Sequence, residues 1–281
     1  MRILLSLFLL FSAASFAADP PPGDRVVCVS KQLNEFIYAV GAERILVARD
    51  LTSVTPPAIL ALPNVGYHRA LSAEGIVSMR PSIVLTDGNV GPDAVLDRVK
   101  EVGIPIVTMK PGEGEEAAQA LMLRLGAYLG HETQAAKIVA DWKRNMQEAI
   151  TQAAAKSGSK KPRVLIMHFG QIGNSYLGLS KGGVGDQMLQ WAGAENALDK
   201  VGGMTRLTPG IIAQAAPDVI IATDVGFDRL GSAEKFKELP GIALTPAGAS
   251  GRIYRIDEGD VMYFAPRTPD ALRRLSAILH P

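Results

Sequence analysis

Three side chains with useful chemistry follow Gly66 in the chain, namely those of Tyr67, His68 and Arg69. Ferric iron favours the phenolate form of a tyrosine and displaces its proton, although free tyrosine has a pKa of about 10. A neighbouring guanidinium such as that of Arg69 further stabilises a phenolate. The alternative is a turn tyrosine whose hydroxyl is hydrogen-bonded within the protein. Neighbouring residues of an extended turn point in opposite directions, so an inward Tyr67 predicts that His68 points outward, at the rim of the cleft or in solvent.

A second candidate ligand is His168, which directly follows the apolar run Arg163–Met167. That run predicts a strand, so His168 is expected at its carboxyl end. It could be a second iron ligand or a cleft histidine without a metal bond, and both alternatives stay open. No two of the four histidines have the spacing of a zinc or manganese site. No nucleophile stands beside a base at the predicted strand ends, so we expect no catalytic residues and no enzyme activity.

Composition narrows the class of protein. The 281 residues are 47% hydrophobic and 20% charged, with a net charge of +1, which is typical of a soluble globular chain. Phosphate binding needs a surplus of basic residues, so nucleic acid is not expected as a partner. A single cysteine, Cys28, allows no internal disulfide and is expected to be a buried thiol.

The first residues predict an exported protein. Met1-Arg2 is a positive start, Ile3–Phe11 is apolar, and Ser15-Phe16-Ala17 is typical of a signal-peptide cleavage site. We therefore expect a signal peptide over 1–17, cleavage near Ala17/Ala18, and a periplasmic product that is not embedded in the membrane. The apolar run is too short to span a bilayer.

The elements that must position these residues alternate between strand and helix, which predicts parallel sheets covered by helices on both faces. In the first half, we expect strands at Arg25–Ser30, Ile45–Ala48, Ile83–Thr86 and Ile106–Met109, and helices at Leu33–Val40, Ala73–Met79 and Ala94–Val99. In the second half, we expect strands at Arg163–Met167, Val219–Ala222 and Ile253–Ile256, and helices at Val184–Ala192, Ile211–Ala215 and Pro269–Leu279.

A long helix separates the two halves. After Gly130, Ile138, Trp142, Met146 and Ile150 recur at helical spacing without a breaker. The pattern predicts one helix of roughly 25 residues, about 37 Å long.

The halves also repeat. Leu71–Leu85 aligns without a gap on Leu207–Ile221, each with a hydroxyl N-cap, a short helix, a proline and an apolar strand. We therefore expect two similar Rossmann-like α/β lobes, each with a central sheet, joined by a single bridging helix, with the ligand cleft between them. The boundaries that we expect are 24–112 for the first lobe, 113–160 for the linker with the helix, and 162–281 for the second lobe.

The two halves differ in length just before the aligned part of the repeat. Gly41 to Leu71 spans about twice as many positions as Gly193 to Leu207. The first lobe therefore has an insertion, and Tyr67 lies in it.

With this organisation, the chain resembles the substrate-binding proteins of ABC importers for cobalamin, iron-siderophores and haem. The run Val65–Gly75 (VGYHRALSAEG) is similar to the one carried by periplasmic haem binders, as is Ala265–Pro269 (APRTP). The likeness covers essentially all of the mature chain. It implies a periplasmic protein that binds ferric haem as transported cargo, acts as a monomer, and delivers the haem to an inner-membrane permease and its ATPase.

The resemblance also implies roles for residues. Tyr67 matches the tyrosine that ligates haem iron, with His168 as a possible second ligand. Arginines suit haem propionates, and Arg69, Arg206 and Arg229 are expected on cleft loops. Arg267 is a weaker candidate. Phe227 and Tyr263 are expected as pocket walls, with core packing as their alternative.

One feature departs from the wider family, which has a glutamate early in the short helix of each lobe for contacts with permease arginines. The first lobe has Glu74, but the second has Gly210 at the aligned position. Glu74 is thus the docking candidate, and docking through a matched pair is in doubt. Two other functions stay open: a protein of the same fold for a ferric siderophore or corrinoid, and a periplasmic hydrolase.

Overall fold

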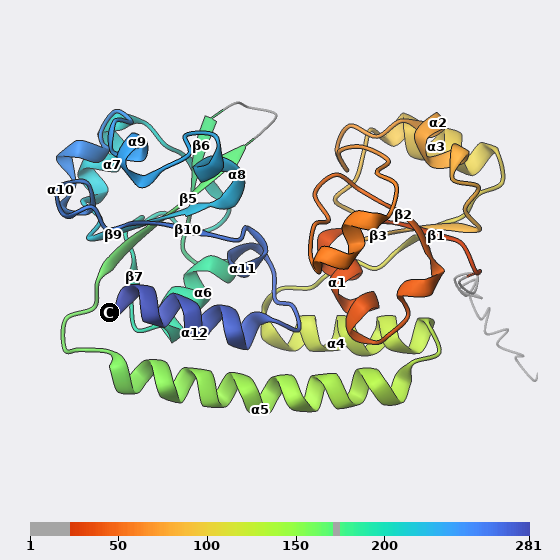
Figure 1. The fold of residues 1–281 in the computed structure, drawn as a ribbon, viewed down its shortest axis with the longest axis horizontal. Coiled ribbons are helices and arrows are strands. Elements are labelled where there is room, and N and C mark those ends of the chain that lie inside the picture. The colour runs from red at the N-terminus through yellow and green to blue at the C-terminus, as the bar shows by residue number, and fades with distance from the viewer. Residues whose placement is uncertain (1–22, 171–174) are drawn as a thin grey trace, which may run out of the picture.

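The computed structural model describes residues 23–170 and 175–281. The expected signal peptide lies outside the described residues. Within them, the chain forms two α/β lobes side by side above one long helix (Figure 1). No helix in the described ranges is long and apolar enough to cross a membrane.

The first lobe contains a fully parallel sheet in the order β2-β1-β3-β4. Its strands are β1 (Val26–Val29), β2 (Leu46–Arg49), β3 (Ile83–Thr86) and β4 (Ile106–Thr108). Alternate residues of β1 pack into different clusters: Val26 and Cys28 on one face, Val27 and Val29 on the other. Because both faces are covered, the strand is a continuous apolar run, as the sequence predicts. Cys28 is a buried free thiol, as expected.

The second lobe contains a mixed sheet in the order β10-β9-β5-β6-β8, with β7 also paired to β5. Its strands are β5 (Arg163–Gly170), β6 (Ser175–Leu179), β7 (Glu195–Asn196), β8 (Met204–Arg206), β9 (Val219–Thr223) and β10 (Ile253–Ile256). The strands β6 and β8 are antiparallel to their neighbours, so the expectation of a parallel sheet is wrong here. The chain returns along β5 directly and needs no crossover helix at that edge.

Twelve α-helices cover the two sheets of the described chain. Their bounds are α1 (Lys31–Ala39), α2 (Ala73–Ser78), α3 (Asp93–Glu101), α4 (Gly114–Tyr128), α5 (Glu132–Lys156), α6 (Val184–Trp191), α7 (Pro209–Ala215), α8 (Asp224–Asp228), α9 (Ala233–Lys237), α10 (Pro246–Ser250), α11 (Gly259–Met262) and α12 (Thr268–Leu279). Three 3₁₀ turns are added, η1 (Glu43–Ile45), η2 (Pro57–Ala61) and η3 (Ile242–Leu244).

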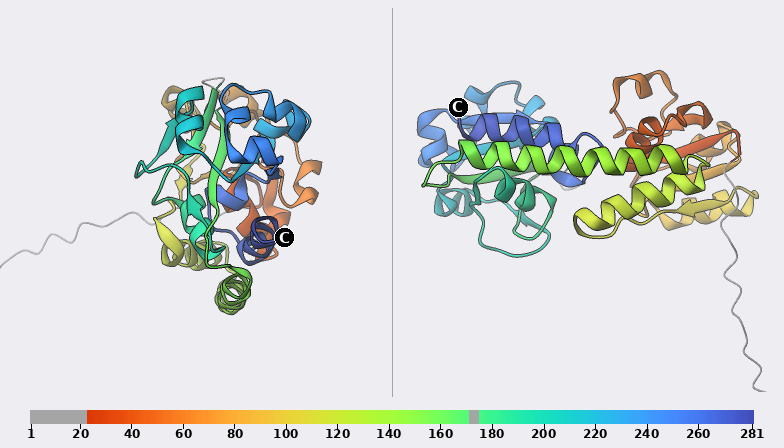
Figure 2. Two further views of the ribbon diagram at one scale, coloured as in Figure 1. Left: turned by 90° about the vertical axis from the view of Figure 1, so that its left-hand side faces the viewer. Right: turned by 90° about the horizontal axis from the view of Figure 1, so that it is seen from below.

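The helix α5 has 25 residues, which confirms the predicted length. It runs beneath both lobes, with α4 beside its first half and α12 beside its second (Figure 2). Its buried side includes Trp142 and Met146, which belong to one apolar cluster that also takes in both sheets. The lobes are therefore joined through a shared core as well as through the chain.

The side-chain caps of two helices confirm the internal repeat. Ser72 accepts a hydrogen bond from the Gly75 amide at the start of α2, and Thr208 accepts one from the Ile211 amide at the start of α7. Each helix leads into a strand, β3 or β9, that lies between two parallel neighbours. The first lobe's extra residues form the segment 50–70, which carries Tyr67 to the inner side of that lobe.

Candidate functional site

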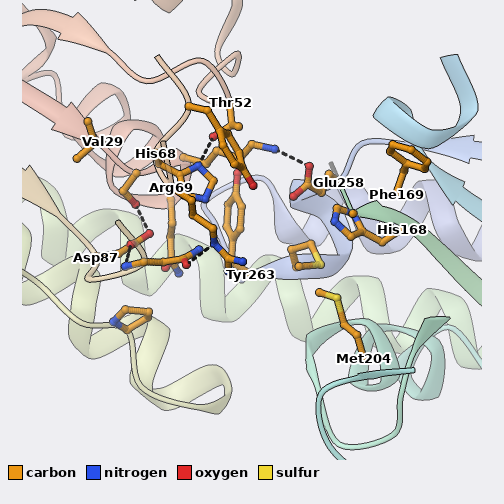
Figure 3. A pocket seen from close by; sticks show the side chains of 18 of the residues that line it. Val29, Thr52, His68, Arg69, Asp87, His168, Phe169, Met204, Glu258 and Tyr263 are labelled. Carbon is orange, nitrogen blue, oxygen red and sulfur yellow. Dashed lines mark hydrogen bonds and ion pairs between the residues drawn. The ribbon is translucent and has the colours of Figure 1, made fainter. Parts of the chain in front are cut away.

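A cavity of about 460 Å³ lies between the lobes, at the carboxyl ends of the parallel strands (Figure 3). This is the position that open α/β sheets favour for ligands. Residues from the first lobe that line it are Val29, Ser30, Lys31, Gln32, Thr52, Tyr67, His68, Arg69, Asp87, Asn89 and Pro111. Those from the second lobe are His168, Phe169, Gly170, Leu177, Met204, Glu258, Met262 and Tyr263.

The turn that carries Tyr67 is fixed at both ends. Gly66 has a φ of +105°, a conformation that glycine adopts without steric cost. The Leu51 amide donates to the Gly66 carbonyl at 2.8 Å, and the Gly91 amide donates to the His68 carbonyl at 2.9 Å. These bonds hold the turn between the segment after β2 and the loop after β3.

The hydroxyl of Tyr67 has no hydrogen-bond partner among the described residues. The alternative of a turn tyrosine tied down by its own hydroxyl therefore finds no support in the described part of the chain. The neighbouring Arg69 lines the same cavity, and its Nε donates to Asn89 Oδ1 at 2.9 Å. The structure thus brings a phenol without an internal partner and an oriented guanidinium to one wall.

His68 lines the cavity beside Tyr67, so the expectation that it points away from Tyr67 is wrong. Its ring lies 4.5 Å from that of Tyr67, centroid to centroid, and its Nδ1 lies 3.6 Å from Oδ2 of Asp50. Asp50 is fully buried and also accepts hydrogen bonds from the hydroxyls of Thr52 and Ser53. Burial opposes ionisation of Asp50, but the bonds from His68, Ser53 and Thr52 outweigh it and lower its pKa. The contact of His68 with this buried carboxylate explains why the side chains of Tyr67 and His68 do not point in opposite directions.

His168 faces the first lobe from β5, as the strand-end argument predicts. Its Nδ1 lies 3.3 Å from Thr223 Oγ1, which leaves Nε2 without a partner among the described residues. Burial lowers the pKa of His168, against an opposing effect of Glu258. The ring is therefore neutral at neutral pH, which is the form that can ligate a metal.

The structure does not bring Arg206, Arg229 and Phe227 to the cavity wall. Arg206 is an exposed residue of β8. The guanidinium carbon of Arg229 lies 4.2 Å from the ring centroid of Phe169, so Arg229 stacks on a residue that lines the cavity. Phe227 stacks on Phe236 in the core of the second lobe.

Tyr263 does line the cavity, and it belongs to a polar network that crosses between the lobes. Its hydroxyl donates to Glu35 Oε1 at 2.7 Å, and Arg267 Nε donates to Glu35 Oε2 at 2.9 Å. Arg267 also binds Asp260 at 2.5 Å and Asp257 at 2.9 Å. Arg267 is thus committed to the contact between the lobes, although the sequence indicated it as a weak propionate candidate.

A second polar contact between the lobes was missed by the sequence. Lys31 Nζ lies 2.8 Å from Oε2 of Glu258, and both side chains line the cavity. Lys31 begins α1 directly after β1, so the strand-end argument that found His168 could also have found Lys31. Glu74 lies elsewhere, exposed in the first turn of α2. The short helices α2 and α7, which hold Glu74 and Gly210, lie on the side remote from α5 (Figure 1).

Comparisons with known proteins agree with this architecture. The family model described as periplasmic binding protein matches residues 26–259. No curated protein sequence matches the chain. Among solved structures, the apo form of the periplasmic haem-binding protein RhuT from Roseiflexus sp. RS-1 has a TM-score of 0.83 and 28% identity, covering 91% of this chain and 97% of that one.

Two further structures are similar. The periplasmic haem-binding protein BhuT, solved with two haems, has a TM-score of 0.79 and 32% identity, covering 91% of this chain and 98% of that one. A periplasmic haem-binding protein from Pseudomonas aeruginosa has a TM-score of 0.79 and 29% identity, covering 92% and 93% of the two chains.

Proposed function

Since the chain belongs to the family of periplasmic binding proteins, we propose that it binds ferric haem between its lobes and delivers it to an ABC importer. The observation that carries the proposal is Tyr67, which lines the interlobe cavity with its hydroxyl unbonded by any described residue. The structures of haem-binding relatives at 28–32% identity support the same cargo.

The ligand set that we propose has Tyr67 on the iron. When ferric iron binds, the phenol loses its proton, and the Arg69 guanidinium stabilises the phenolate that remains. The bond from Arg69 to Asn89 holds this cation on the correct wall before haem arrives. Nε2 of His168 is available as a second axial ligand from the opposite lobe, to the same haem or to a stacked second one.

Delivery would take place in the periplasm, where the family acts, and would involve a permease and its ATPase. We place Glu74 of α2 in the contact with the permease, with no matching carboxylate at Gly210. The protein would act as a monomer and perform no chemistry on its cargo. An N-terminal signal peptide cleaved near Ala17/Ala18 would export it. The shared core beneath the lobes favours modest closure on binding rather than a large hinge rotation.

Haem titration followed by visible absorbance tests the assignment. We expect a Soret shift with wild type, and its endpoint gives one haem or two. Tyr67→Phe keeps the ring and deletes the hydroxyl, and should weaken binding by at least about 10–100-fold, the loss seen when even an outer partner of a metal ligand is removed. Tyr38→Phe makes the same change outside the cavity and should bind as wild type does.

Two results would contradict the proposal. The absence of a Soret shift in wild type would favour the alternative of a ferric siderophore or corrinoid ligand. An unchanged spectrum and affinity in Tyr67→Phe would remove Tyr67 from the iron.

A further inference from the structure

The charged side chains that line the cavity differ in how firmly they are bound by neighbouring groups. Among the described lining residues, the permanent cations are Lys31 and Arg69, and the carboxylates are Asp87 and Glu258. Asp87 is occupied within the first lobe, since it accepts from the Ser30 hydroxyl at 2.6 Å and from the Asn89 amide at 2.8 Å. Arg69 is tied to a neutral amide. Among the described lining residues, Lys31 and Glu258 therefore form the ion pair that can exchange a partner for a ligand.

This ion pair crosses the cleft. Lys31 stands at the start of α1 in the first lobe, and Glu258 stands after β10 in the second. Each side chain keeps 18% of its surface exposed, so the pair borders the space that a ligand would enter (Figure 3). The Glu258 amide donates to Asp224 Oδ1 at 3.3 Å, which fixes the backbone that presents the carboxylate.

We propose that Lys31 is a carboxylate anchor of the cavity and that Glu258 is a built-in competitor for it. The inference rests on the proposed function, because haem is a ligand with two carboxylates. On binding, Lys31 exchanges the carboxylate of Glu258 for one of the ligand.

The exchange predicts opposite changes in ligand affinity when Lys31 or Glu258 is replaced. When the ligand binds, Lys31 exchanges one carboxylate for another. The free-energy cost therefore falls on Glu258, whose carboxylate exchanges its cation for water. Removing the negative charge of Glu258 frees Lys31 in the empty protein and should therefore strengthen ligand binding. A pair that only holds the lobes together would behave differently, because losing either member would then weaken binding.

The test compares two substitutions in the full-length mature protein by haem titration. Lys31→Met should lower haem affinity about tenfold, the effect of losing one charge-assisted hydrogen bond. Glu258→Gln should raise it about two- to fivefold, as expected for a partly exposed ion pair. Lys143→Met, on the exposed face of α5, makes the same charge change away from the cavity and should leave affinity unaltered.

The ligand arm uses haem dimethyl ester, which keeps the iron and the ring but has no carboxylates. With this probe, Lys31→Met and Glu258→Gln should both bind as wild type does. Thermal melts of each variant verify folding. A second probe, iron-free protoporphyrin, followed by quenching of protein fluorescence, reports the carboxylate contact without the iron bond.

The outcomes separate the two claims. If wild type shows no Soret shift, the haem assignment itself fails. If haem binds and depends on Tyr67, but Lys31→Met leaves the affinities for haem and protoporphyrin unchanged, the anchor is refuted and the assignment stands. If Lys31→Met and Glu258→Gln both weaken haem binding, the pair is an interlobe tie, and competition is refuted.

Discussion

Replacing Arg267 by methionine should destabilise the fold through one buried carboxylate. Arg267 binds Glu35 from the first lobe and Asp260 and Asp257 from its own lobe. Asp260 keeps its second partner, Arg274 at 2.8 Å, and Asp257 is 34% exposed and can be hydrated. Glu35 is 5% exposed at its side chain and keeps only the Tyr263 hydroxyl among these partners.

The magnitude follows from that difference. Leaving one buried charge unpaired costs about 3–5 kcal/mol, and the remaining bond from Tyr263 places Glu35 at the lower end of that range. We expect Arg267→Met to lower the free energy of unfolding by about 3 kcal/mol, which lowers Tm by about 5–6 °C for a chain of this size.

The loss should also depend on pH. Burial raises the pKa of Glu35, and Arg267 opposes that effect. Without Arg267 the folded-state pKa rises further above the unfolded value of about 4.3. A raised pKa favours the folded state below the unfolded pKa, and that contribution is lost as pH rises through the folded pKa. The penalty of Arg267→Met should therefore be larger at neutral pH than near pH 5.

Urea unfolding followed by far-ultraviolet circular dichroism at both pH values measures this loss. Arg144→Met is the matched control on α5, because its pair with Asp141 is exposed at both side chains and should contribute less than about 1 kcal/mol. Equal unfolding midpoints for the two variants, or a penalty for Arg267→Met that does not shrink at low pH, would refute the reasoning.

Two other predictions concern the cavity. Gly66→Ala strains a residue with a φ of +105° by about 1–2 kcal/mol, and it should weaken haem binding because Tyr67 is the next residue. The control Gly41→Ala, at a φ of +77°, should cost similar stability without weakening haem binding. Equal haem affinities of the two variants in titrations would contradict this prediction. Burial lowers the pKa of His168, so part of the stability at neutral pH is lost as pH falls below about 6.5. Thermal melts of His168→Gln should show a smaller loss of Tm between pH 7 and pH 5 than melts of wild type. An equal loss of Tm in the two proteins would count against this prediction.

The elements with a strong local pattern could be predicted from the sequence. The four residues of β1 form a continuous apolar run, and the 25 residues of α5 keep one helical period, so their extents were expected within a few positions. The paired caps Ser72 and Thr208 also mark the repeat directly. The strands β6 and β8 were missed, because β8 has three residues without a buried side chain and carries little hydrophobic signal.

The polar contacts across the cleft could not be predicted in the same way. Glu35 and Arg267 are 232 positions apart, and no periodicity relates residues at such a distance. His68 was assigned to the wrong side because its direction is set by Asp50, a buried partner 18 positions earlier in the chain. Tyr67 was found because a motif marks it, whereas Lys31 belongs to no motif and only its place directly after β1 marks it.

The apolar cluster that includes Trp142 has a consequence for dividing the chain. It takes in both sheets, and Trp142 Nε1 donates to the Ala265 carbonyl at 2.9 Å. A cut in the loop 157–162 would leave two fragments, each with part of an unfinished core. Neither fragment should fold alone, but the two should reassemble when mixed. The chain is therefore suited to fragment complementation, with ligand binding recovered on reassembly as the signal.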